Sequence, residues 1–173
     1  MKKWIEKHSI FLSLLLVIAV MVMIYCFSAQ TGVESGAVSG RITTWVLKLI
    51  LPGFEDFSQE KQDAIRSTVG FLVRKGAHFS EYALLGFSLM LHIAQIQKKI
   101  TVGLPWLWAW VIGTIYAASD EFHQGFVAGR GPSVRDVMID SAGVMAGTLI
   151  LIWIVHRCKK CYNKKKHKRT IEI

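Results

Sequence analysis

Residues 10–27 read IFLSLLLVIAVMVMIYCF, and Ser13 is the only polar interruption of this apolar run. An α-helix rises about 1.5 Å per residue, so a run of this length nearly spans the roughly 30 Å hydrocarbon core of a bilayer. A cleaved signal peptide usually has a shorter apolar core of about 7–15 residues, and the residues that follow, SAQ at 28–30, make a poor cleavage site. The stretch therefore predicts a retained membrane-spanning helix.

Three further apolar runs follow the first along the chain. Apolar residues make up 52% of the 173 residues and charged residues only 19%, and the charges gather in blocks between the runs. We therefore expect an all-α membrane protein in which residues 1–156 form one domain with four transmembrane helices. The expected spans are about 10–27, 74–97, 104–122 and 136–156.

The basic residues predict how these spans are oriented. Four spans place both termini on one side, together with the N-terminal lysines, the Lys98-Lys99 loop and the eight Lys and Arg residues that follow residue 156. The other side has fewer basic residues, and they are spread over a longer stretch of chain. By the positive-inside rule we expect a multi-pass protein of the cell membrane with both termini in the cytoplasm.

The net charge of +9 comes largely from the basic tail at residues 157–173. No aromatic platform or groove-reading motif accompanies these charges, which argues against a nucleic-acid partner. A basic segment directly after an apolar helix is typical of a cytoplasmic anchor that faces anionic lipids. We therefore expect membrane lipids as partners and no nucleic acid.

The outer segment between the first two spans predicts an amphipathic helix at about residues 38–51. Apolar residues such as Val38, Ile42 and Trp45 recur there at helical spacing, with polar residues between them. The segment is too short to cross a bilayer, so we expect it to lie on the membrane surface or to cap the bundle. Asp56 followed by Gln59 resembles a capping box that opens the next helix.

The three cysteines predict no disulfide framework. Cys26 ends the first apolar run, and Cys158 and Cys161 form a single C-x-x-C without a second pair. We expect all three to be reduced thiols near the membrane surface.

Ionisable residues inside the apolar runs are the most unusual feature of the sequence. Each costs about 2.5–3.5 kcal/mol on insertion scales, so such residues require partners or a function. Here they fall near the outer ends of the second, third and fourth runs, and helical spacing places those of each run on one face. They are Arg74, His78, Glu81 and Tyr82, then Asp120, Glu121, His123 and Gln124, then Asp136 and Asp140.

Two further features point these polar faces toward a common interior. Small residues deeper on the third and fourth runs, Gly113, Gly143 and Gly147, allow the helices to approach closely. The glycine-rich loop between these runs supplies Arg130 and Arg135. A guanidinium pairs equally well with a carboxylate or a phosphate, so these arginines either clamp the loop or receive an anion.

Many of these residues belong to a longer pattern that resembles the VanZ-like family over about residues 27–147. The resemblance implies a small bacterial membrane protein, and the family's founding member is associated with low-level resistance to the glycopeptide teicoplanin. The chain departs from the pattern at Ala128, where a proline often stands, and at Asp140, where asparagine is common. The matching residues are Phe27-Ser28-Ala29-Gln30, Arg74-Lys75-Gly76-Ala77-His78, Glu81-Tyr82, Leu85-Gly86, Ser119-Asp120-Glu121-Phe122-His123-Gln124, Phe126, Gly129-Arg130, Ser133-x-x-Asp136 and Gly143.

Three classes of function fit an outward-facing polar cluster. In the first, the protein binds a lipid-linked cell-wall precursor, a lipoglycopeptide or another anionic ligand, and so contributes to teicoplanin resistance or envelope lipid handling. In the second, it is a hydrolase or transferase that acts on a lipid phosphate, with Glu121 and His78 as acid and base. In the third, it is a non-catalytic scaffold that acts through a membrane partner.

Each class uses different residues of the cluster. No cofactor is evident, and without an H-E-x-x-H motif the signal for a divalent metal is weak, with His78, His123, Glu121 and Asp120 as the candidate ligands. The candidate acid–base residues of an enzyme are His78, Glu81, Asp120, Glu121 and His123. The candidate ligand-binding residues are Arg74, Lys75, Tyr82, Gln124, Arg130, Ser133, Arg135, Asp136 and Asp140.

Overall fold

The computed structural model describes residues 2–97 and 104–171, with side chains described at residues 8–97 and 104–164. Within these ranges the chain is helical and contains no strand, which confirms the predicted all-α class. The elements are α1 (Lys2–Ser28), α2 (Gly32–Ile50), the short 3-10 helix η1 (Phe54–Asp56), α3 (Gln59–Gln97), α4 (Leu104–Gln124) and α5 (Val134–Ile171).

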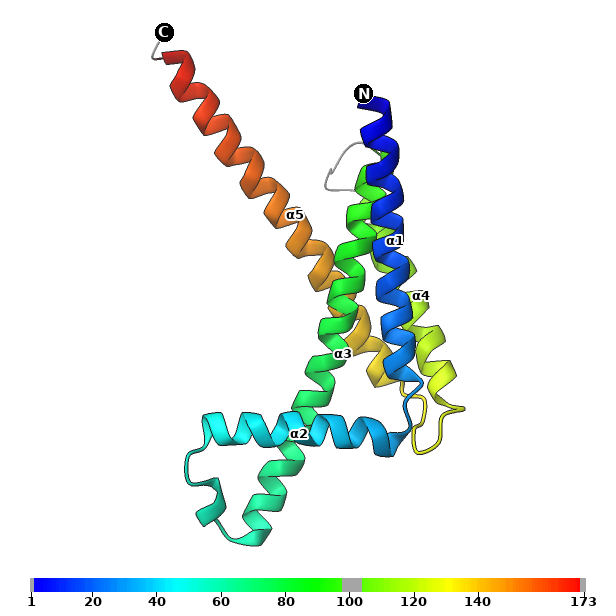
Figure 1. Cartoon of the computed structure of the whole chain (residues 1–173), viewed down its shortest axis with the longest axis vertical. Coiled ribbons are helices and arrows are strands. Elements are labelled where there is room, and N and C mark those ends of the chain that lie inside the picture. The colour runs from blue at the N-terminus through cyan, green and yellow to red at the C-terminus, as the bar shows by residue number, and fades with distance from the viewer. Residues whose placement is uncertain (1, 98–103, 172–173) are drawn as a thin grey trace.

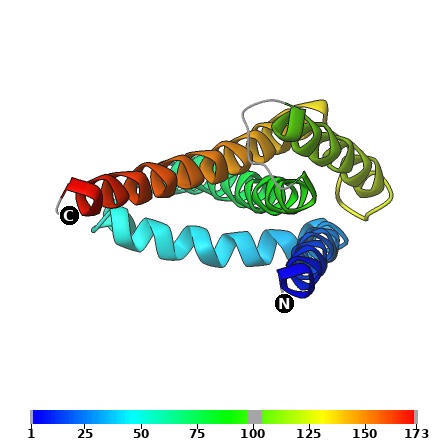
Figure 2. The same cartoon turned by 90° about the horizontal axis from the view of Figure 1, so that it is seen from above.

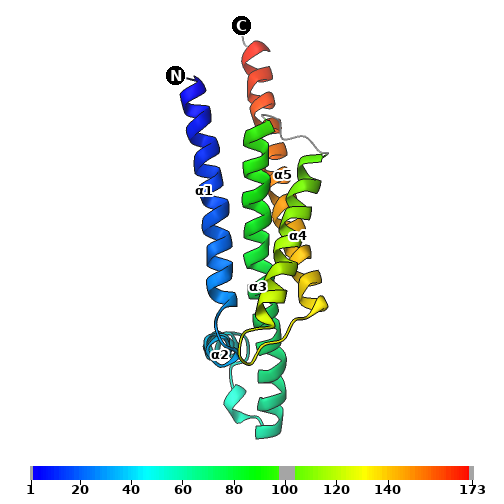
Figure 3. The same cartoon turned by 90° about the vertical axis from the view of Figure 1, so that its right-hand side faces the viewer.

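Four long helices run up and down, with α5 inclined to the other three (Figure 1), and α3 lies at their centre. Figures 2 and 3 show α3 between α1 on one side and α5 with α4 on the other. Figure 1 shows α2 lying across the end of this bundle, while α3 passes beside α2 and extends past it. Both termini lie at the end of the bundle opposite to α2 (Figure 1).

Three helices are long and apolar enough to cross a membrane. They are α1 over His8–Ser28, α3 over Gln59–Gln97 and α5 over Val134–Lys164. Over the residues that the structure describes, the fourth predicted span, α4, is not among them, and its C-terminal part, SDEFHQ at residues 119–124, is strongly polar. The structure therefore shows three candidate spans of the four that the sequence predicts.

The second and fourth predicted spans are parts of longer helices. Helix α3 begins at Gln59, where the sequence predicts that the next helix opens, and continues without a break through the second predicted span. Helix α5 continues through the basic segment to Ile171, so the part of the predicted tail that the structure describes is helical. The predicted Lys98-Lys99 loop lies outside the described residues.

The amphipathic helix α2 is present but begins six residues earlier than predicted, at Gly32 instead of residue 38. The sequence reading missed its capping box, in which the Glu34 amide donates to the Thr31 hydroxyl and the Thr31 amide donates to the Glu34 carboxylate. These bonds from Thr31 lower the pKa of Glu34, which is fully exposed. The box therefore favours the start of α2 once Glu34 is ionised and weakens as the pH falls through that pKa.

The capping box predicted at Asp56 and Gln59 is wrong. Asp56 belongs to η1, and Gln59 is already the first residue of α3. The Gln59 side chain instead donates to Asp63 one helical turn further on, at 3.1 Å.

Helices α3 and α5 approach so closely that their backbones are in contact. A Cβ atom added to Gly86 would overlap the Val144 carbonyl, and one added to Gly147 would overlap the Ala83 carbonyl. A Cβ atom added to Gly143 would lie only 2.5 Å from the Phe79 carbonyl oxygen. The prediction that small residues permit close approach of α5 is thus confirmed, and α3 is the helix that it meets.

Polar side chains tie the other helices together. The Ser13 hydroxyl on α1 lies 2.9 Å from His92 Nδ1 on α3, so His92 is a hydrogen-bonded packing residue. The Tyr116 hydroxyl on α4 donates to the Met21 carbonyl on α1 at 2.7 Å. Trp110 on α4 donates to the Ser141 hydroxyl on α5 at 3.0 Å, so this tryptophan belongs to the bundle contact. The three cysteines are free and exposed, as predicted.

Candidate functional site

A polar cavity of about 300 Å³ opens where α2 crosses the bundle. Arg74, Lys75 and His78 on α3 line one side of it, and Arg130 from the α4–α5 loop lines another. Asp136 is the only acid among the described lining residues, and its Oδ1 lies 2.5 Å from Lys75 Nζ. Because that acid already has a cation as its partner, the two arginines leave the cavity positively charged.

A second, mainly apolar cavity of about 200 Å³ adjoins the first. The two cavities share Ser35, Arg74, His78 and Arg130, so they meet at the cationic side chains. The second cavity extends from there between the end of α1, the start of α2 and α3. Its other lining residues are Phe27, Gln30, Val38, Ser39, Ile42, Val73, Ala77 and Glu81.

The α4–α5 loop holds Arg130 in place between the two cavities. Gly129 adopts a positive φ of 75°, and the Gly32 amide donates to the Ala128 carbonyl at 3.0 Å. Arg130 Nη2 donates to the Phe27 carbonyl at 3.3 Å. This carbonyl lies in the last turn of α1, where it also accepts from the Gln30 amide at 3.3 Å and where the helix dipole favours a cation. Arg130 therefore clamps the loop and also lines both cavities.

His78 faces the junction of the cavities. Its Nδ1 atom is buried and has no hydrogen-bond partner. The ring interacts electrostatically with Lys75, Arg130, Asp136 and Asp120, so it lies among both cationic and acidic groups. A histidine with one free buried nitrogen is suited to donate to, or accept from, a group that enters the cavity.

Behind the polar cavity, Asp120 and Glu121 on α4 are buried and hydrogen-bonded within the protein. The Ser133 amide donates to Glu121 Oε2 at 2.9 Å, and Gln124 Nε2 donates to Asp120 Oδ2 at 3.2 Å. Ser133 directly precedes α5, so the Glu121 carboxylate meets the positive end of that helix. Glu121 lines neither cavity described above.

Several residues predicted for the site lie elsewhere. The His123 ring packs on the Tyr25 ring of α1, with centroids 4.9 Å apart, and lines neither cavity. Arg135 is exposed and lies over the Phe71 ring, with its guanidinium carbon 5.2 Å from the centroid. Tyr82 and Asp140 are fully buried in the bundle below the polar cavity. The remaining predicted residue, Ser133, accepts a bond from the Asp136 amide at 3.3 Å and so caps α5.

The proposed metal ligands are not gathered around one point. His123 packs against α1, whereas His78 faces the cavities. In the part of the chain that the structure describes, no group of three or more His, Cys, Asp or Glu side chains is arranged to hold a metal ion.

The family model described as VanZ/LLP1 matches residues 12–155, which is most of the chain. The chain belongs to the VanZ/LLP1 family. No curated protein and no solved structure matches the chain closely enough to add to this assignment. The motif residues that this VanZ-family chain carries on three separate segments meet at the polar cavity, whose wall includes Arg74, Lys75, His78, Gln124, Gly129, Arg130 and Asp136.

The sequence reading missed the contribution of α2 to the site. Gly32 and Ser35 line the polar cavity, and Val38 and Ile42 line the apolar one. The apolar spacing of Val38 and Ile42 is visible in the sequence, but it does not say which element these side chains face. Phe71 on α3 was also missed, because its position in an apolar run gives no sign that it lines a polar cavity.

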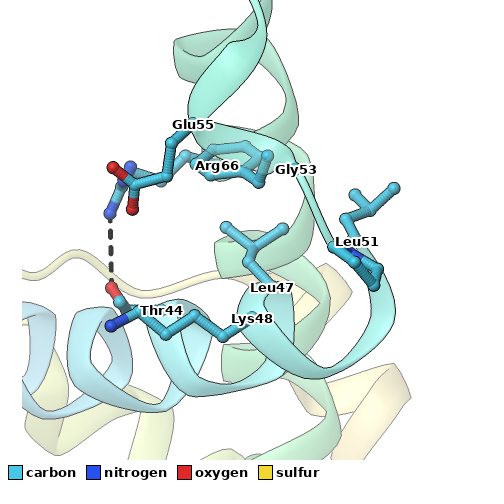
Figure 4. Close-up of a pocket in the computed structure, with 9 residues that line it drawn as sticks. Thr44, Leu47, Lys48, Leu51, Gly53, Glu55 and Arg66 are labelled. Carbon is cyan, nitrogen blue, oxygen red and sulfur yellow. Dashed lines mark hydrogen bonds between the residues drawn. The ribbon is translucent and has the colours of Figure 1, made fainter.

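A third cavity, of about 180 Å³, lies outside the bundle between the end of α2, η1 and the start of α3. Figure 4 shows Arg66 reaching across it toward α2, where its Nη1 donates to the Thr44 hydroxyl at 3.3 Å. The same guanidinium lies over the Phe54 ring, 5.5 Å from the centroid. These contacts tie the segment after α2 back onto α2 and α3, and none of the predicted site residues lines this cavity.

Proposed function

We propose that this VanZ-family protein binds a lipid-linked phosphate of the cell envelope in the polar cavity and in this way contributes to glycopeptide resistance or envelope lipid handling. The positive cavity wall supports the proposal most strongly. Arg74, Arg130 and Lys75 surround a space in which only one acid is present among the described lining residues, and Lys75 already neutralises it. A planar guanidinium can pair with two oxygens of a phosphate at once.

The apolar cavity supports a lipid as the carrier of that anion. It adjoins the polar cavity at Arg74, His78 and Arg130, and its wall includes Phe27, Val38, Ile42, Val73 and Ala77. A ligand that fills both cavities has a charged group directly attached to hydrocarbon. A soluble phosphate would leave the second cavity unused.

The proposed topology places the site at the outer surface of the membrane. We propose that α4 crosses the bilayer as the fourth span, since it lies along the bundle beside α5 and Tyr116 joins it to α1. Both termini are then cytoplasmic, and α2 lies at the outer interface with exposed Trp45 and Leu49 directed toward lipid headgroups. Teicoplanin acts outside the cell, so an outward site agrees with the association implied by the family.

Binding can be measured with a polyprenyl phosphate as the probe and the uncharged polyprenol of equal length as its control. For wild-type protein in nanodiscs, we expect the phosphate to bind at least tenfold more tightly, a difference of about 1.4 kcal/mol. Arg74→Gln should remove this preference, because Arg74 lines both cavities. Arg41→Gln on the exposed face of α2 is the matched control and should bind like wild type.

Equal binding of the phosphate and the alcohol would contradict the proposal, as would unchanged binding by Arg74→Gln. A scaffold without a ligand predicts a third pattern, in which Arg74→Gln lowers the melting temperature and protein level but the wild type shows no phosphate preference. In cells, Arg74→Gln at normal protein level should lose protection against teicoplanin while Arg41→Gln keeps it.

One observation favours an enzyme as the second candidate. His78 and Glu81 both line the apolar cavity next to the two arginines, so an acid–base pair stands beside the proposed phosphate position. In this candidate Glu81 is the acid–base partner of His78, a role that the sequence analysis assigned to Glu121, because Glu121 lines neither cavity. Release of inorganic phosphate from the polyprenyl phosphate by wild type but not by Glu81→Gln would support hydrolysis, and an unchanged lipid would leave binding as the function.

A further inference from the structure

Asp140 on α5 is completely buried and has no partner. Its relative exposure is 0%, and neither of its carboxylate oxygens makes a hydrogen bond. The hydroxyl of Tyr82 on α3 is likewise buried without a partner and interacts electrostatically with Asp140 and Asp120. Native proteins rarely leave buried polar atoms unpaired, so this group of atoms requires an explanation.

The charges around Asp140 do not compensate an anion there. Asp120 and Glu121 face it from α4, Asp136 faces it from its own helix, and Lys75 with Tyr82 faces it from α3. Lys75 is the only cation in this set, and it forms the ion pair with Asp136. A carboxylate at Asp140 would therefore be an unpaired buried charge beside further acids, which is among the most costly arrangements in a protein.

The neighbouring acids differ from Asp140 because each has a donor. Glu121 accepts from the Ser133 amide, Asp120 accepts from Gln124, and Asp136 accepts from Lys75. Each of these three carboxylates therefore has at least one donor, although Glu121 Oε1 is also buried without a partner. Asp140 alone has nothing to accept from, and as a carboxylic acid it would itself supply a donor among neighbouring acceptor oxygens.

From this geometry we propose that Asp140 is a proton-binding site, which holds a proton at neutral pH and keeps the interior of the bundle free of an uncompensated charge. The proton makes Asp140 a donor toward the acidic cluster formed by Asp120, Glu121, Asp136 and Asp140. A shared metal ion is the alternative compensation, but the described residues contain no group of three or more ligands arranged around one. Removal of the proton at alkaline pH places a charge between α3, α4 and α5 and loosens their packing.

Infrared spectroscopy of the purified, ligand-free protein tests the proposal directly. At neutral pH we expect a C=O stretching band of a protonated carboxylic acid that is absent from Asp140→Asn. Asp63→Asn, at an exposed position on α3, is the matched control and should keep the band. If Asp140→Asn does not fold, wild-type protein labelled with ¹³C at the aspartate carboxyl groups should show the same band shifted by the isotope.

Thermal unfolding as a function of pH provides a second measurement. The melting temperature of wild type should fall more steeply than that of Asp140→Asn from about pH 5 up to the pH at which folded Asp140 releases its proton, because the unfolded carboxyl group is already ionised over that range and the asparagine amide is neutral throughout. A protonated-acid band of undiminished intensity in Asp140→Asn would overturn the proposal, as would parallel pH profiles of the two proteins. A melting temperature that rises with Na⁺ or Ca²⁺ in wild type but not in Asp140→Asn would also overturn it, because a metal ion would then supply the compensation. All these measurements use ligand-free protein, so they do not depend on whether a lipid phosphate binds.

Discussion

Arg130 combines two tasks that usually belong to separate residues. Its bond to the Phe27 carbonyl fastens the α4–α5 loop to the end of α1, and the same side chain lines the polar and apolar cavities. The sequence predicts a glycine-rich loop that carries this arginine, and it predicts that the arginine either clamps the loop or binds an anion. Arg130 clamps the loop by a hydrogen bond to the Phe27 carbonyl, and a sequence pattern cannot predict which backbone carbonyl accepts such a bond.

The pair of Lys75 and Asp136 is the best-defined ionic contact at the site, at 2.5 Å with both side chains about one-fifth exposed. Lys75→Met should lower the free energy of unfolding by about 1–3 kcal/mol, because it leaves Asp136 unpaired in a half-buried place. The double variant Lys75→Met/Asp136→Leu should recover part of that loss. Tryptophan-monitored unfolding in detergent measures both, with exposed Lys48→Met as control. A double variant less stable than Lys75→Met would contradict this account.

At the scale of elements, the contact between α3 and α5 organises the bundle. Gly86, Gly143 and Gly147 remove side chains from the interface, and the two backbones then touch. Association of helices within lipid depends on such close packing, since apolar side chains gain little by leaving a hydrocarbon solvent. The same two helices carry His78 and Asp136, which line the polar cavity, so their packing also determines the width of that cavity.

Gly147→Ala tests this contact. The added methyl group overlaps the Ala83 backbone, so we expect a loss of about 1–3 kcal/mol in unfolding free energy. Gly76→Ala is the matched control, because a Cβ at that position on α3 meets no atom within 4 Å, and there alanine should be neutral or stabilising by up to about 1 kcal/mol. Equal melting temperatures for Gly147→Ala and wild type would show that α5 does not pack on α3 in this way.

At the scale of the whole molecule, both termini lie at one end and the polar cavity at the other. The basic segment of α5 belongs to the first end, and α2 crosses the second (Figure 1). An even number of crossings follows if α4 spans the membrane with α1, α3 and α5. The positive-inside rule then places the polar cavity outside the cell.

Two single-cysteine proteins test this topology. Gly131→Cys in a cysteine-free background should react with a membrane-impermeant maleimide in intact cells, since position 131 is exposed and open to a side chain. A protein that keeps only Cys158, which is also exposed, should react only after permeabilisation. The reverse pattern would invert the orientation. Labelling of both in intact cells would mean that α5, which lies between the two positions, does not cross the membrane, and the reverse pattern would also arise if α4 did not cross.

The sequence by itself determined the helices and the family of this protein. Long apolar runs and the spacing of Val38, Ile42 and Trp45 are local properties, because a helix satisfies its own backbone and needs only a suitable run of residues. Helix ends were less accurate, since α2 begins six residues before its predicted start and the capping box predicted at Asp56 and Gln59 is absent, although α3 does begin at Gln59. The grouping of polar residues at one end also followed from spacing alone.

Only the tertiary structure decided which of these polar residues meet. In the structure, His123 packs on Tyr25, and the Glu121 carboxylate accepts a hydrogen bond from the Ser133 amide. Residues of α2 line both cavities. The physical reason is that the rotation and depth of each helix depend on its packing partners, such as the glycine contacts between α3 and α5, and one sequence does not specify the neighbours of a helical face. The same packing buries the Asp140 carboxyl group without a hydrogen-bond partner. This burial is the reason why we propose Asp140 as a proton-binding site.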